Sequence, residues 1–250
     1  MFKKFLSLVL SLSLLISFFG AEAHAAENQS KVNYNGQEFT IDILEDSTTI
    51  KKVQVTNDSM TYITVYDKVN NSVTTEEISL ANTEESTFKK GNSQNVVNSF
   101  TLDLNALEEQ SNNIGNAAAR GIYEGLISYK ITTFWDIKYF VHKFTLPTSY
   151  SWTLECDRGA KRDIEENSSN ASTLESYRLA VNNVNKKQVE AVAVGGTALA
   201  TTIAAGAAAA TGVGAIVSLV TAIGGSITVA YLFWDAKQSA NDANYFFERV

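Results

Sequence analysis

Residues 190–235 read EAVAVGGTALATTIAAGAAAATGVGAIVSLVTAIGGSITVAYLFWD, and they contain the longest uncharged run of the chain. Between its two acidic ends no residue carries a charge and none is proline. Two helical passes through a hydrocarbon layer of about 30 Å need about 40 residues, a length that residues 191–234 supply. We therefore expect residues 191–234 to form an apolar, Gly/Ala-rich helical hairpin with a break between Gly206 and Gly214.

Small residues recur at every fourth position of this expected hairpin. Small residues at this spacing let two helix backbones approach closely, which is how helices associate where no hydrophobic effect drives them. A straight helix rotates such a row by about 40° per step, so only three or four members share one interface. The row consists of Gly206, Ala210, Gly214, Ser218, Ala222, Ser226 and Ala230. Trp234 closes the block beside Tyr231 and Phe233, where aromatic residues of a membrane interface would lie.

Two interpretations of the hairpin stay open. It engages a membrane, with oligomerisation through the hairpin as a further option, or it is a buried pair of helices in a soluble core. The two agree if the soluble form shelters the hairpin and releases it at a target membrane. The pairs Gly195-Gly196 and Gly224-Gly225 would weaken helices by about 1 kcal/mol per glycine relative to alanine, which suits a segment that changes state.

The N-terminus has the layout of a secretory signal peptide. Lys3 and Lys4 precede an uncharged run rich in Leu, Phe and Ser, and small residues follow it. The best cleavage motif ends at Ala25, so we expect residues 1–25 to be removed and the mature chain to begin at Ala26. The apolar run of about 15 residues is short for a membrane anchor, which is the alternative. Without this segment, the net charge of −7 becomes about −8.

The chain between these two ends predicts an α+β fold that begins with a small antiparallel β-meander. Residues 26–80 alternate with period two, as in Phe39, Ile41 and Ile43, and in Ile63 and Val65, which favours three or four strands. Residues 81–99 are rich in Asn, Thr, Glu, Ser and Lys and predict a linker. The sequence does not decide whether the β-region is a pro-segment that is removed.

A mixed α/β, aromatic-rich region is expected next, over residues 100–171, with a helix from Leu102 to Asn113. Its aromatic side chains favour the core of the soluble body, with an exposed subset as a receptor or lipid contact as the alternative. Residues 172–190 predict an amphipathic helix that starts with a capping box at Ser172 and leads into the hairpin. Residues 235–250 are expected to form a polar C-terminal tail.

Composition and motifs exclude several kinds of function. One Cys excludes an intramolecular disulfide framework and multi-cysteine zinc sites, and a pI near 5.0 argues against binding to nucleic acid. After removal of the signal peptide the remaining histidine is His142 and the thiol is Cys156, with no nucleophile motif around it. Acidic pairs such as Glu76-Glu77 favour solvated faces. We expect no enzyme, no catalytic residue, no metal and no cofactor.

A signal peptide, a polar β/α body with Phe134-Trp135 at its aromatic centre, and a Gly/Ala-rich C-terminal block together resemble the large secreted bacteriocins of Gram-positive bacteria, in particular the geobacillin-26-like proteins. The resemblance covers the general layout of the whole chain. It implies a secreted antibacterial protein that acts on related bacteria, with a target membrane or envelope receptor as its partner and a cognate immunity protein as a possible second one. The alternatives are a membrane-anchored envelope interaction or immunity protein and, less favoured, a secreted hydrolase.

Overall fold

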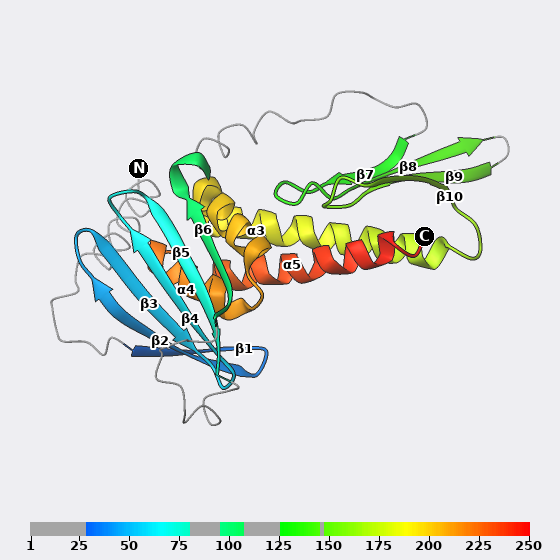
Figure 1. Ribbon diagram of the computed structural model, residues 1–250. Coiled ribbons are helices and arrows are strands. Elements are labelled where there is room, and N and C mark those ends of the chain that lie inside the picture. Colours follow the sequence, from blue (N-terminus) through cyan, green and yellow to red (C-terminus); the bar gives the residue numbers. More distant parts are fainter. Residues whose placement is uncertain (1–28, 81–95, 108–125, 146–147) are drawn as a thin grey trace, which may run out of the picture.

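A computed structural model describes residues 29–80, 96–107, 126–145 and 148–250 of the chain. Figure 1 shows two antiparallel sheets at opposite ends of a bundle of helices. Sheet A curves around one end of the helices, and sheet B lies along the other end. This α+β architecture, with an N-terminal antiparallel meander and C-terminal helices that include a long apolar one, confirms the fold class expected from the sequence. The signal peptide with its cleavage residues Ala25 and Ala26 lies outside the described residues.

Sheet A is a six-stranded meander in which each strand pairs with the next one along the chain. Its strands are β1 (Gln29–Tyr34), β2 (Gln37–Asp46), β3 (Ile50–Thr56), β4 (Met60–Asp67), β5 (Ser72–Ser79) and β6 (Val96–Asp103). The expected count of three or four strands is therefore too low. The end of the expected linker is also wrong, because residues 96–99 belong to β6, whose pairing with β5 supplies the backbone hydrogen bonds of this segment. The expected helix from Leu102 begins only after the strand ends.

On β4, the side chains that face the helices are not the aliphatic ones that hydrophobicity alone would predict. The strand register places Tyr62 opposite Val55 and Thr64 opposite Val53, so Tyr62 and Thr64 share the buried face. Ile63 is on the other face and is only partly buried. Pairing register, rather than the hydrophobicity of single residues, therefore decides which face of this strand is covered.

Sheet B fills most of the aromatic-rich region that the structure describes. Its strands are β7 (Leu126–Ile131), β8 (Lys138–Thr145), β9 (Thr148–Glu155) and β10 (Lys161–Glu165), and they also form a meander. The inner face contributes Tyr139, Trp152 and Leu154 to a hydrophobic core, as expected for a soluble body. Phe144 is half exposed, so part of the aromatic set faces solvent.

Three helices follow: α3 (Ala171–Ala209), α4 (Val213–Ile223) and α5 (Ile227–Phe247). The first part of α3 and the last part of α5 lie beneath sheet B, while α4 lies against sheet A (Figure 1). The break predicted between Gly206 and Gly214 is confirmed, because α3 ends at Ala209 and α4 begins at Val213.

Four expectations about these helices are wrong. Residues 191–234 form the second part of α3, all of α4 and the start of α5, so the block is three helical segments rather than a two-helix hairpin. The amphipathic helix does not stop at residue 190 but continues to Ala209. Its N-cap is Asn170 and no capping box forms, since Glu175 pairs with Arg178 instead. The expected polar tail is helical, because Ala240 and Phe247 bury a stripe of α5 beneath sheet B.

Candidate functional site: the apolar helix α4 against sheet A

The row of small residues is divided among the three helices instead of forming one interface. Gly206 is in α3, Gly214, Ser218 and Ala222 are in α4, and Ala230 is in α5. Ala210 and Ser226 cap helix ends. The change of direction at each break separates the members, so they contact different partners.

Two of the glycines permit close contacts that a larger residue would prevent. A Cβ atom at Gly206 would overlap with the Leu219 side chain of α4. A Cβ atom at Gly214 would overlap with the ring of Tyr62 on sheet A. Small residues thus bring α4 close to both α3 and sheet A, within a core where Ala210, Ala222 and Ala230 are also buried.

A row of buried hydroxyl groups joins α4 to sheet A. The Thr64 hydroxyl is 2.6 Å from the Ser218 hydroxyl and 2.9 Å from that of Thr75 on β5. Ser218 also donates to the carbonyl of Ala215 at 3.0 Å. All three hydroxyl residues are completely buried. The contact between helix and sheet is therefore partly polar, although α4 carries no charged residue and no polar ones besides Ser218 and Thr221.

Glu77 holds the turn between α3 and α4. Its side chain is fully buried, so the expectation that Glu76-Glu77 is a solvated pair is wrong for this member. Its carboxylate accepts hydrogen bonds from the Thr211 backbone N–H at 2.9 Å and from the Thr211 hydroxyl. The Asn98 amide donates to the same carboxylate at 2.8 Å and to the carbonyl of Ala209 at 3.0 Å. Alternation along β5, which puts Glu77 on the same face as Val73, was the available signal in the sequence.

Charges around this turn perturb two neighbouring groups. The Lys237 ammonium of α5 donates to the carbonyls of Ala208 and Ala210 at the C-terminal end of α3. Burial lowers the pKa of Lys237, and the Glu77 carboxylate acts in the opposite direction. Burial, together with the charge of Glu77, raises the pKa of Tyr62 to about 12. The turn is thus fixed by charge-assisted hydrogen bonds from β5 and α5 and by a neutral hydrogen bond from β6.

Glycines with positive φ interrupt the helical path on both sides of this region. Gly196 has φ 77° and kinks α3, and Gly224 has φ 82° and caps α4. These positions fall in the two glycine pairs that were expected to weaken the helices. Other residues rarely adopt such φ values, so both bends depend on glycine. The exposed, uncharged residues next to the kink include Val194, which is 57% exposed.

In this fold the aromatic residues at the end of the apolar block contact different partners. Phe233 is buried and contacts Phe134 edge-on at 5.5 Å. Tyr231 stacks on Tyr34 of β1 at 4.5 Å. Trp234 is partly exposed and lies beneath the Lys237 ammonium, 5.5 Å from the ring centre.

Cys156 and His142 are not brought together. Cys156 is a free, fully buried thiol that follows β9. Glu155 pairs with Lys138 and Ser151 pairs with His142, so the register separates the thiol from His142 by about 16 Å along the strands. Among the residues that the structure describes, no group of three or more His, Cys, Asp or Glu side chains is placed to hold a metal ion.

Comparisons with known proteins find no match: no family model fits the chain, and no curated protein or solved structure shows significant similarity to it. The resemblance to the geobacillin-26-like proteins accordingly stays a prediction.

Proposed function

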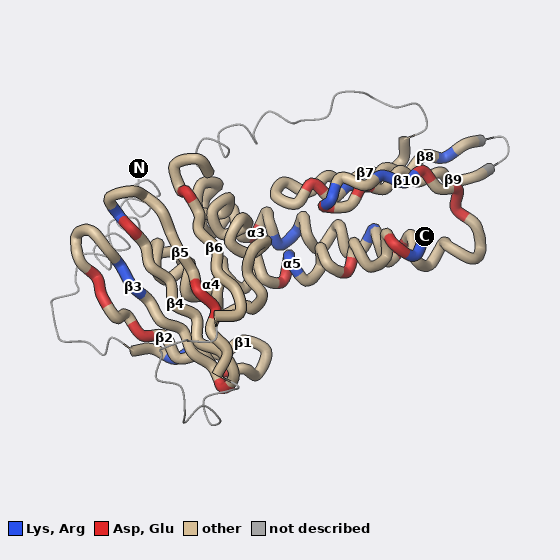
Figure 2. The backbone as a smooth tube through the Cα atoms, in the orientation of Figure 1, with Lys and Arg blue, Asp and Glu red and all other residues tan. Residues whose placement is uncertain are grey.

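We propose that the protein is a secreted antibacterial protein of the bacteriocin type, which acts on the membrane of related bacteria through residues 191–234. The observation that carries the proposal is the cover over α4. A helix without a charged or strongly polar face is typical either of a protein core or of a membrane span, and here sheet A supplies the core. Figure 2 shows that the charged residues of α3 and α5 lie mainly beneath sheet B, away from α4.

Straightening of two glycine bends would convert the buried helices into membrane-spanning ones. Residues 191–209 would form a helix of about 28 Å if the kink at Gly196 were lost. Residues 213–234 would form one of about 33 Å if α4 and α5 became continuous through Gly224. Both lengths match the hydrocarbon core of a bilayer, whereas α4 alone, at about 16 Å, does not. By length and composition, α3 is long and apolar enough to cross a membrane.

The contact between α4 and sheet A contains the groups that make such a release feasible. When α4 leaves sheet A, the sheet's hydroxyl groups and the Glu77 carboxylate form hydrogen bonds with water instead. Separating α4 from the sheet therefore costs less free energy than separating two purely apolar surfaces. The apolar surface of the helices then transfers to lipid instead of to water. In this proposal sheet A is the soluble cover of the membrane-active segment.

A reversible disulfide tests the proposal. Thr64→Cys combined with Ser218→Cys places two thiols where hydroxyl oxygens are 2.6 Å apart, and the native Cys156 is buried. We expect the oxidised variant, starting at Ala26, to lose growth inhibition of related Gram-positive strains and dye release from phosphatidylglycerol-containing vesicles. Reduction should restore both activities, because it frees α4.

A matched disulfide within sheet A is the control. Thr74 and Thr101 face each other on β5 and β6 with their hydroxyl oxygens 2.9 Å apart, and neither touches α4. Thr74→Cys with Thr101→Cys should stay active in both redox states. Equal activity of the oxidised Thr64/Ser218 pair would refute release of α4. A mature protein that neither inhibits any related strain nor releases dye would refute the proposed function.

Fractionation of the producing culture separates the proposal from an envelope anchor. A secreted toxin is expected in the culture supernatant with its N-terminus at Ala26, whereas an anchored interaction or immunity protein would stay with washed membranes. Mass spectrometry of the supernatant protein also establishes whether the β-region is removed.

A further inference from the structure

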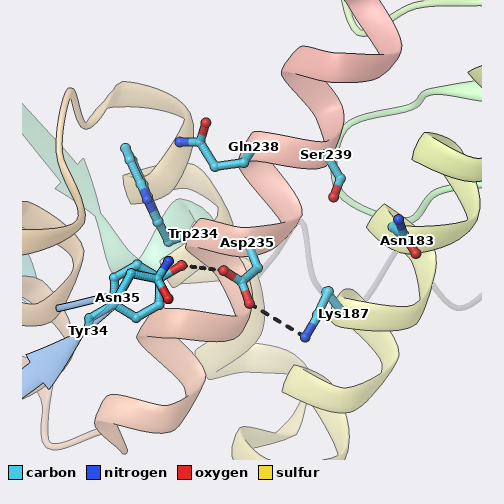
Figure 3. A pocket seen from close by; sticks show the side chains of 8 residues that line it. All are labelled: Tyr34, Asn35, Asn183, Lys187, Trp234, Asp235, Gln238 and Ser239. Atoms are coloured by element: carbon cyan, nitrogen blue, oxygen red, sulfur yellow. Dashed lines mark hydrogen bonds and ion pairs between the residues drawn. The ribbon is translucent and has the colours of Figure 1, made fainter. Parts of the chain in front are cut away.

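An open groove lies where the β1–β2 turn meets α3 and α5, outside the buried contact of α4 (Figure 3). Its volume is about 560 Å³, which is in the range of small-molecule binding pockets. The lining residues come from all three elements: Tyr34, Asn35, Asn183, Lys187, Trp234, Asp235, Gln238 and Ser239. Of these residues, only Tyr34 and Trp234 pack against the apolar core, and both do so at its edge.

The floor of the groove is held in place by an aromatic pair and a carboxylate. Tyr34 stacks on Tyr231 with an interplanar angle of 25°, and its hydroxyl donates to the carboxylate of Asp235. The other oxygen of Asp235 is 3.5 Å from the ammonium of Lys187. Burial and the hydrogen bond to Asp235 raise the pKa of Tyr34, which keeps this donor protonated. Asn35, with φ 51°, forms the turn that places Tyr34 here. The groove is thus preformed, with Asp235 fixed by Tyr34 and Lys187.

Polar side chains on the two helices remain available to a ligand. Asn183 is one turn before Lys187 on α3, and Gln238 and Ser239 follow Asp235 by one turn on α5. The amides of Asn183 and Gln238 and the hydroxyl of Ser239 make no hydrogen bond or ion pair within the part of the chain that the structure describes. Each amide and the hydroxyl can both donate and accept hydrogen bonds. In Figure 3 the indole of Trp234 stands at one side of this polar set.

Charge and shape select the ligand class. The carboxylates of Asp235 and Glu190 balance the ammonium groups of Lys187 and Lys237 around the groove, so it attracts neither a phosphate nor a cation strongly. A partly exposed indole suits a ligand with an apolar C–H face, and the surrounding amides, hydroxyl and carboxylate suit a ligand that carries many hydroxyl groups. Neutral sugars combine these two properties. We infer that this groove binds a neutral oligosaccharide, with the face of Trp234 that Lys237 does not cover as the stacking platform and Asn183, Gln238 and Asp235 as hydrogen-bond partners.

Binding is tested on the mature chain with defined glycans and without cells or membranes. The panel contains hexasaccharides of N-acetylglucosamine, of β1–4-linked glucose, of α1–4-linked glucose and of mannose. Calorimetric titration should show that at least one of these glycans binds to the protein. Trp234→Ala should lower the affinity for that glycan about tenfold or more, and Gln238→Ala, at an exposed position, about threefold to tenfold. Asn241→Ala, on an exposed part of α5 outside the groove, should leave the affinity unchanged.

Three results would overturn the inference: no glycan of the panel binds at about 5 mM, the groove variants bind as well as the wild type, or an acidic hexauronate binds more tightly than every neutral glycan. The inference does not depend on the proposed membrane action. A protein that inhibits growth but binds no glycan would refute only the groove, and a protein that binds glycan without inhibiting growth would refute only the toxin.

Discussion

Sheets A and B cover the same helices at two places, but they do so with different kinds of side chain. Beneath sheet B the contact is made by large residues, with Tyr177 and Leu174 of α3 buried against Trp152 and Leu154. Tyr177 also donates to the carbonyls of Lys138 and Glu155 at 3.0 and 2.7 Å. Beneath sheet A the helix contributes small residues and a hydroxyl, and its backbone comes close to Tyr62.

The two contacts should therefore tolerate different kinds of substitution. Large interdigitated side chains lose stability when they are shortened, because a cavity remains. Where two backbones lie close together, replacing a small residue by a larger one lowers the stability of the protein, because the neighbouring atoms have no space into which to move. Among the described helices, α4 in the sheet A contact is the one without a charged residue, so our proposal assigns release to that end and anchoring to the sheet B end. The following predictions test this division, in decreasing order of effect.

Enlargement of Gly214 should have the largest effect on stability. Gly214→Leu forces a side chain into the ring of Tyr62, and we expect the free energy of unfolding in urea to fall by about 3 kcal/mol or more. Ala198→Leu, at an exposed position of α3, is the size-matched control and should change it by less than about 0.5 kcal/mol. Similar losses for the two variants would show that α4 does not pack closely on sheet A.

Neutralisation of Glu77 should come next. Glu77→Gln replaces an acceptor of three hydrogen bonds by a group with one acceptor oxygen, and we expect a loss of about 2 to 3 kcal/mol. Amide hydrogen exchange should accelerate first at residues 211–214, since the turn is opened locally. Dye release from vesicles should increase at the same time. Glu76→Gln, on the opposite face of the same strand, is the control. Unchanged exchange at the turn would contradict the role of Glu77.

Loss of the Tyr177 hydroxyl tests the other end of the molecule. Tyr177→Phe leaves the buried carbonyls of Lys138 and Glu155 without this donor and should cost about 1 to 2 kcal/mol in urea unfolding. Dye release should not increase, because the α4 contact is intact. An increase that matches that of Glu77→Gln would show that any destabilisation promotes release, and the division into two functional ends would be wrong.

The smallest expected effect is a change of stability with alkaline pH. The folded state holds the proton of Tyr62 more tightly, with a pKa of about 12 against 10.0, so the stability that this provides is complete below pH 10 and is lost as the pH rises toward 12. By pH 11 the loss attributable to Tyr62 is about 1.4 kcal/mol. Tyr62→Phe should lack this part of the decline in urea unfolding between pH 9 and 11. An equal decline in both proteins would mean that Tyr62 is not buried beside Glu77.

The sequence was informative where periodicity was strong and local. Alternation in residues 26–80 predicted the meander, and the lack of charge in residues 191–234 predicted buried or membrane helices with a break in the right place. The C-terminal tail was missed because its buried stripe consists mainly of alanines among polar residues, which carry little hydrophobic signal. The polar groups around α4 were missed because Thr64 and Glu77 acquire their role only through the register of distant strands.

The groove was beyond prediction for a related reason. Tyr34 and Asp235 are 201 residues apart, and no local pattern connects them. Trp234 was expected in a membrane interface because of its neighbours in the sequence, whereas in this fold it packs at the edge of the core beside the groove. Contacts of this separation follow from the packing of whole elements.

The order of the elements along the chain has a consequence for biogenesis. Every strand of sheet A precedes Leu104, whereas the apolar block begins at Ala191. A chain made N-terminus first therefore completes the strands of the cover before the segment that needs covering emerges. The apolar residues then meet a folded surface instead of other nascent chains, which limits aggregation. With the reverse order of elements, the same contacts would have to form after exposure of the segment to water.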